Sequence, residues 1–290
     1  MDEPLLEIRG ATKTWPSFRM EGVDLVLPGG LILGLVGANG AGKTTLLKLA
    51  MGLLRPDGGT FRFRGRDFGK DGKDLRRRIG YGPEEPRFPA EARLEALGRA
   101  YGRFYPDWDG GRWRTLMGEF GLDPRAKAGT LSMGMRTKAA LALVLAREAD
   151  LLVLDEPTTA LDPVFRRELL RRLSGLIQDE GRAILFSTHI TTDLEDRVDL
   201  VALLRSGRLV FNLDRETLRE RYVLVKGDPA LLEQAGRDAF LGLRTTPHGF
   251  EALAEDGPAL RDLLGGRALV ERPSLEDLVV LMGRRPLHVP

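Results

Sequence analysis

The sequence predicts an α/β fold: a mainly parallel β-sheet with helices on its faces, a helical insertion and a small C-terminal accessory domain. Apolar runs at residues 31–36, 151–154 and 183–187 alternate with helical patterns, as in proteins built around a parallel sheet. Helical patterns broken by prolines and glycines cover about residues 90–148. After about residue 219 the long apolar strands stop, which indicates a separate, smaller unit.

Each element is expected from its own pattern, in chain order. We expect strands at residues 5–9, 23–27, 31–36, 60–64, 79–82, 151–154 and 183–187, and a hairpin at 200–204 and 208–213. We expect helices at residues 44–53, 90–103, 112–121, 133–147, 163–179 and 191–197, with weak helical patterns at 228–236 and 274–283. The chain then divides into a domain at residues 1–218, with a helical subdomain at about 87–148, and an accessory domain at 219–290.

Composition excludes several classes of protein. The 290 residues include no cysteine, which excludes structural disulfides and thiolate metal sites. The net charge is only +2, and arginine doublets such as Arg166-Arg167 lie among acids, so no nucleic-acid partner is expected. The longest apolar stretches, such as residues 139–146, are too short for a membrane span, and the first residues lack a signal-peptide pattern. We therefore expect a cytoplasmic chain whose membrane role, if any, depends on a partner.

The most specific motif is the segment GANGAGKTT at residues 37–45, which follows an apolar strand and opens a helix. A glycine-rich turn of this kind directs backbone N–H groups into one concavity that holds phosphate oxygens. Lys43 would add positive charge at the β- and γ-phosphates, and the Thr44 hydroxyl would bind Mg²⁺. An ordinary turn needs neither the lysine nor the two threonines, so phosphate binding is strongly favoured. The expected nucleotide-binding residues of this loop are Asn39, Gly40, Gly42, Lys43, Thr44 and Thr45.

Acidic residues follow the strand at residues 151–154. Asp155 is expected near the phosphate loop as a group that holds Mg²⁺, and Glu156 as the carboxylate that orients and deprotonates an attacking water. His189 follows the next strand along the chain, within reach of the same point. The alternative is a strand that simply ends in two acids and a proline, and the upstream phosphate loop makes it unlikely.

Two weaker signals concern a helix cap and an aromatic ring. Ser132 is expected to cap the helix at 133–147, with Gly134 nearby, and this helix end could bind an anion as well as merely begin a helix. One phosphate loop already provides a complete cradle, so a second anion site could serve a nucleotide held by another copy of the chain. Trp15 lies in an expected polar loop, where it could stack on a purine or pack in a small apolar cluster.

The order of these motifs resembles the ATP-binding cassette (ABC) ATPases, which are P-loop NTPases with an antiparallel β subdomain. The resemblance covers about residues 5–215 and rests on residues 37–45, Leu131-Ser-Met-Gly-Met135, residues 151–156, Ala160-Leu-Asp162 and His189. It implies a head-to-tail dimer that encloses two ATP molecules with Mg²⁺. Lys43 and Thr44 of one subunit would face Ser132 and Gly134 of the other. In the same resemblance Asp162 matches the D-loop, Glu156 the catalytic base, His189 the switch histidine and Trp15 the adenine-stacking aromatic.

Three features depart from the common family pattern. The signature segment is Leu-Ser-Met-Gly-Met, which keeps the serine and second glycine but lacks the usual glutamine. Glu84 stands where the family usually has glutamine; a carboxylate could still face Mg²⁺ or water there, and its added charge would alter nucleotide sensing. Together with Tyr105-Pro-Asp-Trp-Asp109, Glu84 resembles a bacterial exporter subgroup often encoded beside GntR-type regulators. Residues 272–278 are similar to the closing segment of ABC-2 type exporter ATPases, although a capped amphipathic helix explains the same letters.

The sequence therefore predicts the ATP-hydrolysing subunit of a bacterial exporter, peripheral on the inner face of the cell membrane. Its expected partners are integral-membrane permease subunits and a second ATPase subunit, identical or paralogous. A soluble ABC protein acting on ribosomes or DNA is the main alternative, but such proteins usually carry two cassettes, long coiled coils or zinc-binding cysteines. A non-catalytic nucleotide-binding regulator is a third possibility, which the presence of both Glu156 and His189 disfavours.

Overall fold

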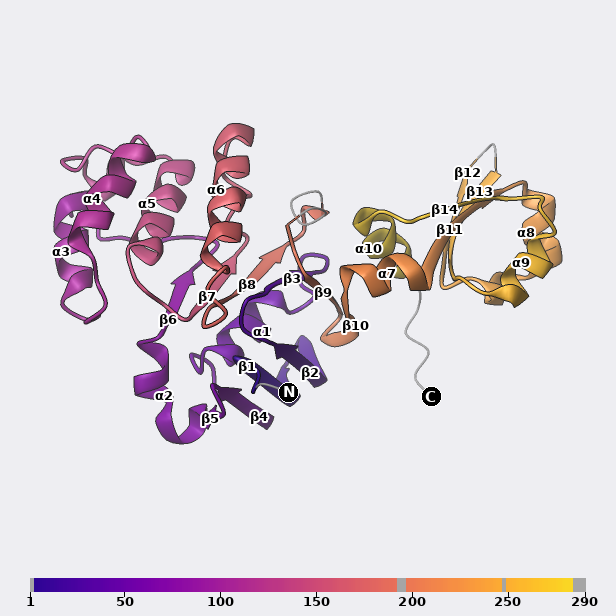
Figure 1. Ribbon diagram of the computed structural model, residues 1–290, viewed down its shortest axis with the longest axis horizontal. Coiled ribbons are helices and arrows are strands. Elements are labelled where there is room, and N and C mark those ends of the chain that lie inside the picture. Colours follow the sequence, from indigo (N-terminus) through magenta and orange to yellow (C-terminus); the bar gives the residue numbers. More distant parts are fainter. Residues whose placement is uncertain (1–2, 192–196, 247–248, 284–290) are drawn as a thin grey trace.

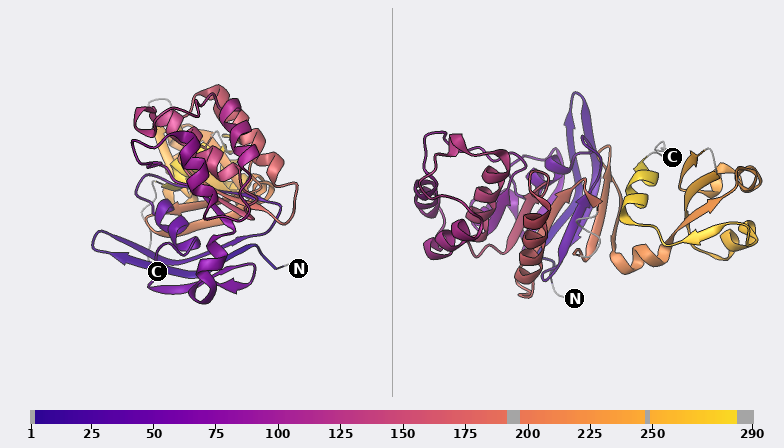
Figure 2. Two further views of the ribbon diagram at one scale, coloured as in Figure 1. Left: turned by 90° about the vertical axis from the view of Figure 1, so that its left-hand side faces the viewer. Right: turned by 90° about the horizontal axis from the view of Figure 1, so that it is seen from above.

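The computed structural model describes residues 3–191, 197–246 and 249–283. This part of the chain contains three β-sheets: the N-terminal sheet lies beside the central sheet, and the C-terminal sheet lies further along the long axis (Figure 1). The helices α3–α5 lie at one end of the molecule and the C-terminal sheet at the other, which Figure 2 shows from two further directions.

The central sheet has six strands in the order β10-β9-β3-β8-β7-β6. Its strands are β3 (Ile32–Val36), β6 (Ile79–Gly82), β7 (Leu151–Asp155), β8 (Ala183–Thr188), β9 (Leu200–Arg205) and β10 (Arg208–Asp214). All neighbouring pairs are parallel except β9 and β10, which form an antiparallel hairpin. The expected mainly parallel sheet is therefore confirmed, and the carboxyl ends of β3, β7 and β8 meet at one edge, where ligands of such sheets bind.

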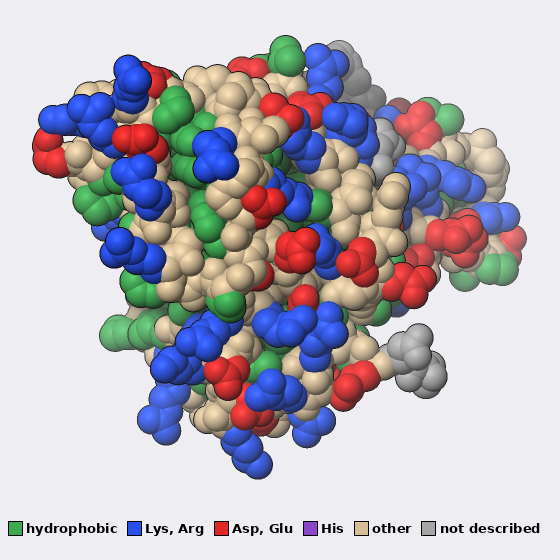
Figure 3. All heavy atoms as spheres, turned by 60° about the vertical axis from the view of Figure 1, so that its left-hand side comes forward, with side chains coloured by type: hydrophobic (Ala, Val, Ile, Leu, Met, Phe, Trp, Pro, Cys, Tyr) green, Lys and Arg blue, Asp and Glu red, His purple; other side chains and the backbone are tan. Residues whose placement is uncertain are grey.

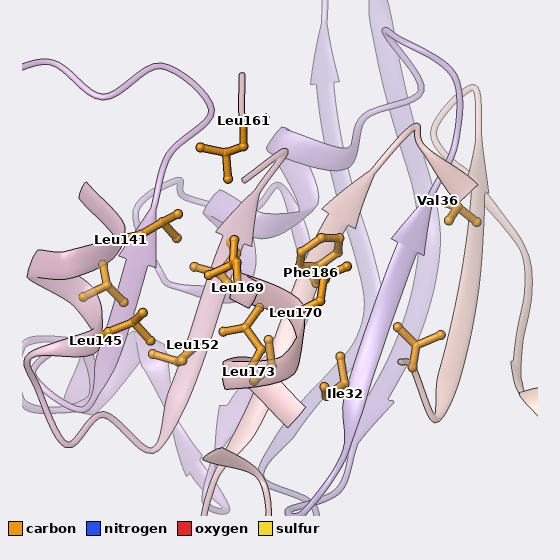
Figure 4. Close-up of a cluster of buried hydrophobic side chains, with 14 of the residues drawn as sticks. Ile32, Val36, Leu141, Leu145, Leu152, Leu161, Leu169, Leu170, Leu173 and Phe186 are labelled. Atoms are coloured by element: carbon orange, nitrogen blue, oxygen red, sulfur yellow. The ribbon is translucent and has the colours of Figure 1, made fainter. Parts of the chain in front are cut away.

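Two apolar layers bury the faces of the central sheet, because successive side chains of a strand point to opposite sides. Ile184 and Phe186 face the helices α4 (Gly110–Glu119), α5 (Met133–Leu145) and α6 (Pro163–Leu176), and Figure 4 shows part of this layer. Ala183 and Leu185 face the other way, toward α1 (Lys43–Ala50) and the N-terminal sheet. The helical insertion is completed by α3 (Leu94–Gly102) and the short turn η1 (Ala128–Thr130).

The N-terminal sheet is antiparallel, in the order β2-β1-β4-β5. It consists of β1 (Leu6–Trp15), β2 (Phe18–Leu27), β4 (Gly58–Phe63) and β5 (Arg66–Asp67), followed by α2 (Phe68–Arg76). The expected antiparallel β subdomain is confirmed. The expected loop around Trp15 is wrong, because β1 continues to this residue and turns directly into β2. The segment β5–α2 was not expected. Its sequence is rich in glycine and charged residues, and α2 buries only Phe68, Gly72 and Leu75, so it lacks a clear apolar helical pattern.

The C-terminal part also contains a sheet, which corrects the expectation that strands stop after about residue 219. Its order is β12-β13-β11-β14, with β11 (Tyr222–Gly227), β12 (Gly242–Thr246), β13 (Gly249–Glu255) and β14 (Leu269–Glu271). The helices α8 (Pro229–Ala235) and α9 (Pro258–Leu264) and the turn η3 (Arg237–Ala239) accompany it, and α8 and α9 share its apolar core. The expected helical patterns at 228–236 and 274–283 correspond to α8 and to α10 (Leu275–Gly283).

The proposed boundary between residues 218 and 219 falls inside helix α7 (Arg215–Arg221). Leu275, Leu278 and Leu281 of α10 belong to the same apolar cluster as Phe211 of the central sheet. The C-terminal sheet therefore has its own core on one face and shares a core with the rest of the chain on the other. The expected helix at 191–197 lies almost entirely outside the described residues.

Two general properties of the described part bear on function. None of its helices is long and apolar enough to cross a membrane. On the face shown in Figure 3, Lys and Arg side chains lie among Asp and Glu side chains.

Candidate functional site

A cavity of about 550 Å³ lies over the phosphate loop, at the carboxyl edge of the central sheet. The following residues line it: Trp15, Ser17, Phe18, Ala38, Asn39, Gly40, Gly42, Lys43, Thr44, Thr45, Glu84 and Glu156. All eight residues expected to bind the nucleotide from one subunit are among them. The volume lies within the range of about 300–1,000 Å³ that is typical of small-molecule sites.

The loop between β3 and α1 depends on glycine at two positions. Gly42 directly precedes α1 with φ +105°, and a Cβ there would lie 2.4 Å from Cζ of Phe18. Gly37 has φ +158°, and a Cβ there would lie 2.3 Å from the carbonyl oxygen of Leu204. A larger residue at either position would clash or strain the loop that the cavity is built on.

Lys43 is the buried cation of the site. Its Nζ donates to the carbonyl oxygen of Gly37 at 2.8 Å and lies 3.2 Å from Oε1 of Glu156. Both side chains are nearly inaccessible to solvent, at 7% and 5%. The lysine is therefore held over the loop by backbone carbonyl groups of the loop and by the acid that follows β7.

Asp155 ends β7 and meets two hydroxyl groups. The Thr44 hydroxyl donates to its Oδ2 at 2.7 Å, and the Ser187 hydroxyl donates to its Oδ1 at 2.6 Å. Asp155 and Ser187 are register partners in the parallel pair β7–β8, which explains why their side chains meet. Thr44 and Asp155 thus bring two oxygen ligands to one point beside the phosphate loop.

Glu156 is held in a left-handed backbone conformation, with φ +47°. Its Oε2 lies 2.8 Å from Nδ1 of His189 and accepts from the Thr159 hydroxyl at 3.3 Å. Its backbone N–H donates to the carbonyl oxygen and to the hydroxyl of Ser187, both at 3.1 Å. A non-glycine residue in this region is strained, so the surrounding bonds must hold it there.

Burial and nearby carboxylates raise the pKa values of Glu84 and of Tyr81. Burial raises the pKa of Glu84, the negative charges of Asp155 and Glu156 raise it further, and Lys43 lowers it. Burial, together with the charges of Asp155 and Glu84, raises the pKa of Tyr81 to about 12. The acids of the site therefore repel one another, a condition that a bound cation would relieve.

Trp15 stands at the end of β1 on the wall of the cavity, with 40% of its surface exposed. Nζ of Lys13 lies 4.9 Å from the centroid of the indole ring. An exposed aromatic face beside a phosphate site can stack on a planar base.

Ser132, Gly134 and Asp162 lie together but do not line the cavity of their own chain. The expected cap is confirmed, because the Ser132 hydroxyl accepts from the N–H of Met135 at 3.3 Å. A Cβ on Gly134 would lie 2.8 Å from the carbonyl oxygen of Ala160, which places the start of α5 against the loop before α6. Asp162 caps α6, and the N–H groups of Val164 and Phe165 lower its pKa.

Sequence reasoning missed Ser187 and Thr159, which bond to Asp155 and Glu156. For Ser187 a signal was present: Ala183, Leu185 and Ser187 share one face of β8, so a serine stands where the alternation predicts a buried apolar side chain. A buried hydroxyl needs a partner, and the nearest strand end offers acids. No comparable signal marks Thr159, which lies in a loop.

The residues at this edge fit a magnesium ion. The Thr44 hydroxyl, Asp155 and Glu84 offer oxygen atoms, the donors that Mg²⁺ prefers. In the described part of the chain no group of three or more His, Cys, Asp or Glu side chains could hold a metal by itself.

Comparisons with known proteins identify relatives of the chain. Residues 20–159 match the family described as "ABC transporter". The chain is 35% identical to the daunorubicin/doxorubicin resistance ATP-binding protein DrrA of Streptomyces peucetius over 214 residues, which cover 71% of this chain and 64% of that protein. It is 33% identical to the ABC transporter ATP-binding protein NatA of Bacillus subtilis over 205 residues, 68% of this chain and 82% of that protein.

Another relative is the Nod factor export ATP-binding protein I of Burkholderia lata, at 34% identity over 66% of this chain and 64% of that protein. The chain thus spans slightly less than two thirds of the length of DrrA and of this protein. Among solved structures, an ATP-binding subunit of an ABC transporter superposes with a TM-score of 0.68 at 29% identity, over 74% of this chain and 92% of that one. A dimeric ATP-binding cassette bound to ADP and phosphate shares the fold, with a TM-score of 0.66 at 20% identity over 72% of this chain and 98% of that one.

Proposed function

The chain belongs to the ABC transporter family of ATP-binding proteins, and we propose that it is the ATP-hydrolysing subunit of a bacterial exporter. The observation that carries this proposal is the position of Glu156. Its carboxylate lines the cavity, 3.2 Å from the lysine of the phosphate loop and 2.8 Å from His189. A base beside a phosphate cradle is the arrangement that hydrolysis of a terminal phosphate requires.

Each side chain has a role in this proposal. The N–H groups of the loop and Lys43 bind the phosphates, and Trp15 stacks on the adenine. Glu156 orients a water molecule and takes its proton, while His189 holds the carboxylate in place. Thr44, Asp155 and Glu84 hold Mg²⁺, which when bound neutralises charge on the phosphates.

We also propose that the complete site contains parts of two subunits. Ser132, Gly134 and Asp162 do not line the cavity of their own chain, although Ser132 and Gly134 form an exposed helix start of the kind that binds phosphate. In a head-to-tail dimer this helix start would close over the nucleotide of the partner. The partner is a second ATPase subunit, either an identical chain or a paralogue.

A membrane permease is the proposed second partner, which would place the chain on the inner face of the cell membrane. An apolar groove of about 350 Å³ supports this proposal, because it joins the loop of Glu84 to the helical insertion. Its lining includes Pro83, Pro86, Phe88, Tyr101 and Tyr105. A permease segment in this groove would contact both the nucleotide-sensing loop and the helices that lead to Ser132. The subgroup encoded beside GntR-type regulators and the lack of a nucleic-acid partner stay predictions.

The decisive experiment replaces Glu156 by glutamine, which keeps the shape and removes the charge and the basicity. We expect Glu156→Gln to bind ATP with an affinity within about threefold of the wild type and to lose at least about a hundredfold in kcat. Phosphate release and binding of a fluorescent ATP analogue would be measured on the same preparation. Glu148→Gln, at an exposed acid outside the site, is the matched control and keeps its activity. Steady-state hydrolysis by Glu156→Gln at the rate of the wild type would contradict the proposed role.

A further inference from the structure

Ser187 is a fully buried polar residue that the proposed mechanism does not use. It lies on the face of β8 that continues through Leu185 and Ala183 into the apolar layer under α1. Ala183 lies on the same face of β8, four residues before Ser187. Packing in this layer alone therefore does not require a hydroxyl group at residue 187. The hydroxyl must therefore be explained by what it bonds to.

Both partners of this hydroxyl belong to the two acids of the site. It donates to Oδ1 of Asp155 at 2.6 Å and accepts from the backbone N–H of Glu156 at 3.1 Å. The donor and the acceptor function of the hydroxyl are thus both satisfied by Asp155, which ends β7, and by Glu156, which follows it. The carbonyl oxygen of Ser187 accepts from the same N–H of Glu156, also at 3.1 Å.

These bonds have two geometric consequences. Because Oδ1 of Asp155 is occupied by Ser187, the carboxylate cannot rotate freely, and Oδ2 stays beside the Thr44 hydroxyl at 2.7 Å. Because the N–H of Glu156 is held from two sides, the left-handed backbone with φ +47° is kept, and the side chain reaches His189. Oγ of Ser187 thus bonds to both acids, and the carbonyl oxygen of the same residue also holds Glu156.

We propose that Ser187 is the positioning residue that orients the carboxylates of Asp155 and Glu156, and thereby sets the affinity of the nucleotide site for Mg²⁺. The inference rests on the proposed function, since it assigns Asp155 to the metal. Residues that bond to the ligands of a metal commonly change metal affinity or activity by about 10- to 100-fold when they are replaced.

The test compares Ser187→Ala with Ser187→Thr, which keeps the hydroxyl on a residue suited to a strand. Binding of a fluorescent, non-hydrolysable ATP analogue would be titrated at rising Mg²⁺ concentration and, separately, in EDTA. We expect Ser187→Ala to raise the half-saturating Mg²⁺ concentration about tenfold or more and to leave binding in EDTA within about twofold of the wild type. Ser187→Thr should stay within about threefold of the wild type in both conditions. Ser174→Ala, which removes a hydroxyl that bonds only to the carbonyl oxygen of Leu170, is the control.

Each other outcome has a definite meaning. An unchanged Mg²⁺ titration for Ser187→Ala overturns the inference, and so does an equal loss of binding with and without Mg²⁺, because that indicates a purely structural role. A wild-type protein whose nucleotide binding never responds to Mg²⁺ overturns the proposed function instead. If Ser187→Ala does not fold, Ser187→Cys replaces it, because a thiol of similar size is a weak donor. The cysteine variant should show the same rise in half-saturating Mg²⁺, and a wild-type titration for it overturns the inference.

Discussion

Glu84 is an acid of the site whose negative charge lies near two other acids. Its partial burial on the wall of the cavity raises its pKa, and the negative charges of Asp155 and Glu156 raise it further. Because the pKa is raised in the folded protein, ionisation of Glu84 is less favourable there than in the unfolded chain. Stability is then lost as the pH rises from the ordinary value of 4.5 through the raised value.

We therefore expect Glu84→Gln to be more stable than the wild type at pH 7.5, in the absence of nucleotide and Mg²⁺. The gain in Tm should be small, up to about 2 °C, because the side chain is largely exposed. The difference in Tm between the two proteins should shrink as the pH falls through the raised pKa and below 4.5, because below that value Glu84 is mostly protonated in both states. Thermal unfolding between pH 4 and pH 8 measures it. A difference that does not change with pH would show that Glu84 acts through packing and not through its charge.

At the scale of single elements, the segment Tyr105–Asp109 helps to connect the helical insertion to the central sheet through Arg147. Arg147, which follows α5, has a fully buried side chain that bonds to Oδ2 of Asp107 at 3.3 Å. Its Nη1 donates to the carbonyl oxygen of Ile79 in β6 at 3.0 Å, and its guanidinium lies 3.6 Å from the ring centroid of Tyr105. The unusual residues of this segment thus have a structural role, whatever subgroup they indicate.

Asp107→Asn should destabilise the protein, because it leaves a buried guanidinium without its carboxylate. We expect a loss of about 2 kcal/mol, which corresponds to a fall in Tm of about 4–8 °C for a chain of this size. Glu91→Gln is the matched control, since Glu91 pairs with Lys127 at 2.6 Å on the exposed surface, and Tm should change by less than about 2 °C. Differential scanning calorimetry of both variants tests the prediction. Equal shifts for the two would mean that the buried pair contributes no more than a surface pair.

The same scale shows which parts of the fold the sequence could predict. The strands and helices around the phosphate loop were predicted because long apolar runs and glycine breaks mark them. Helix α2 and the sheet β11–β14 were missed for a physical reason. Helix α2 buries only one narrow side, and β14 is three residues long with all of them exposed. Elements of this kind are stabilised by tertiary contacts, which short sequence windows do not contain.

For the site, the sequence predicted which residues gather but not how the backbone holds them. Lys43, Thr44, Asp155, Glu156 and His189 were named from their motifs, and the structure places them within one network. The left-handed Glu156 and its bond to Ser187 depend on the register of β7 with β8, which only the folded sheet defines. Whether these residues have the proposed roles stays a prediction that the variants above test.

At the scale of the whole molecule, the residues of the proposed site lie in two separate places on one chain. Lys43 lies in the cavity, whereas Ser132 starts α5 outside it. In a head-to-tail dimer each nucleotide would need Lys43 from one subunit and Ser132 from the other. Each chain would then contribute Lys43 to one nucleotide site and Ser132 to the other.

Mixing two inactive variants tests this division. Lys43→Ala and Ser132→Arg should each hydrolyse almost no ATP alone, while an equal mixture should recover up to about a quarter of the wild-type rate, because half of random dimers then contain one intact site. Steady-state hydrolysis of the separate and mixed proteins measures the recovery. A mixture of Lys43→Ala with Glu156→Gln is the control, since both changes fall in the same half and restore nothing. A mixture of the first pair that is no more active than its components would contradict a site shared by identical chains.

The contact between Lys43 and Glu156 affects which counter-ion the lysine of the phosphate loop has. Lys43 has an anionic neighbour at 3.2 Å within its own chain, so the pair is close to neutral. A triphosphate that binds to this loop would replace one counter-ion by another instead of entering a bare positive site. In the proposed mechanism the carboxylate of Glu156 would then leave the lysine and become available as the base.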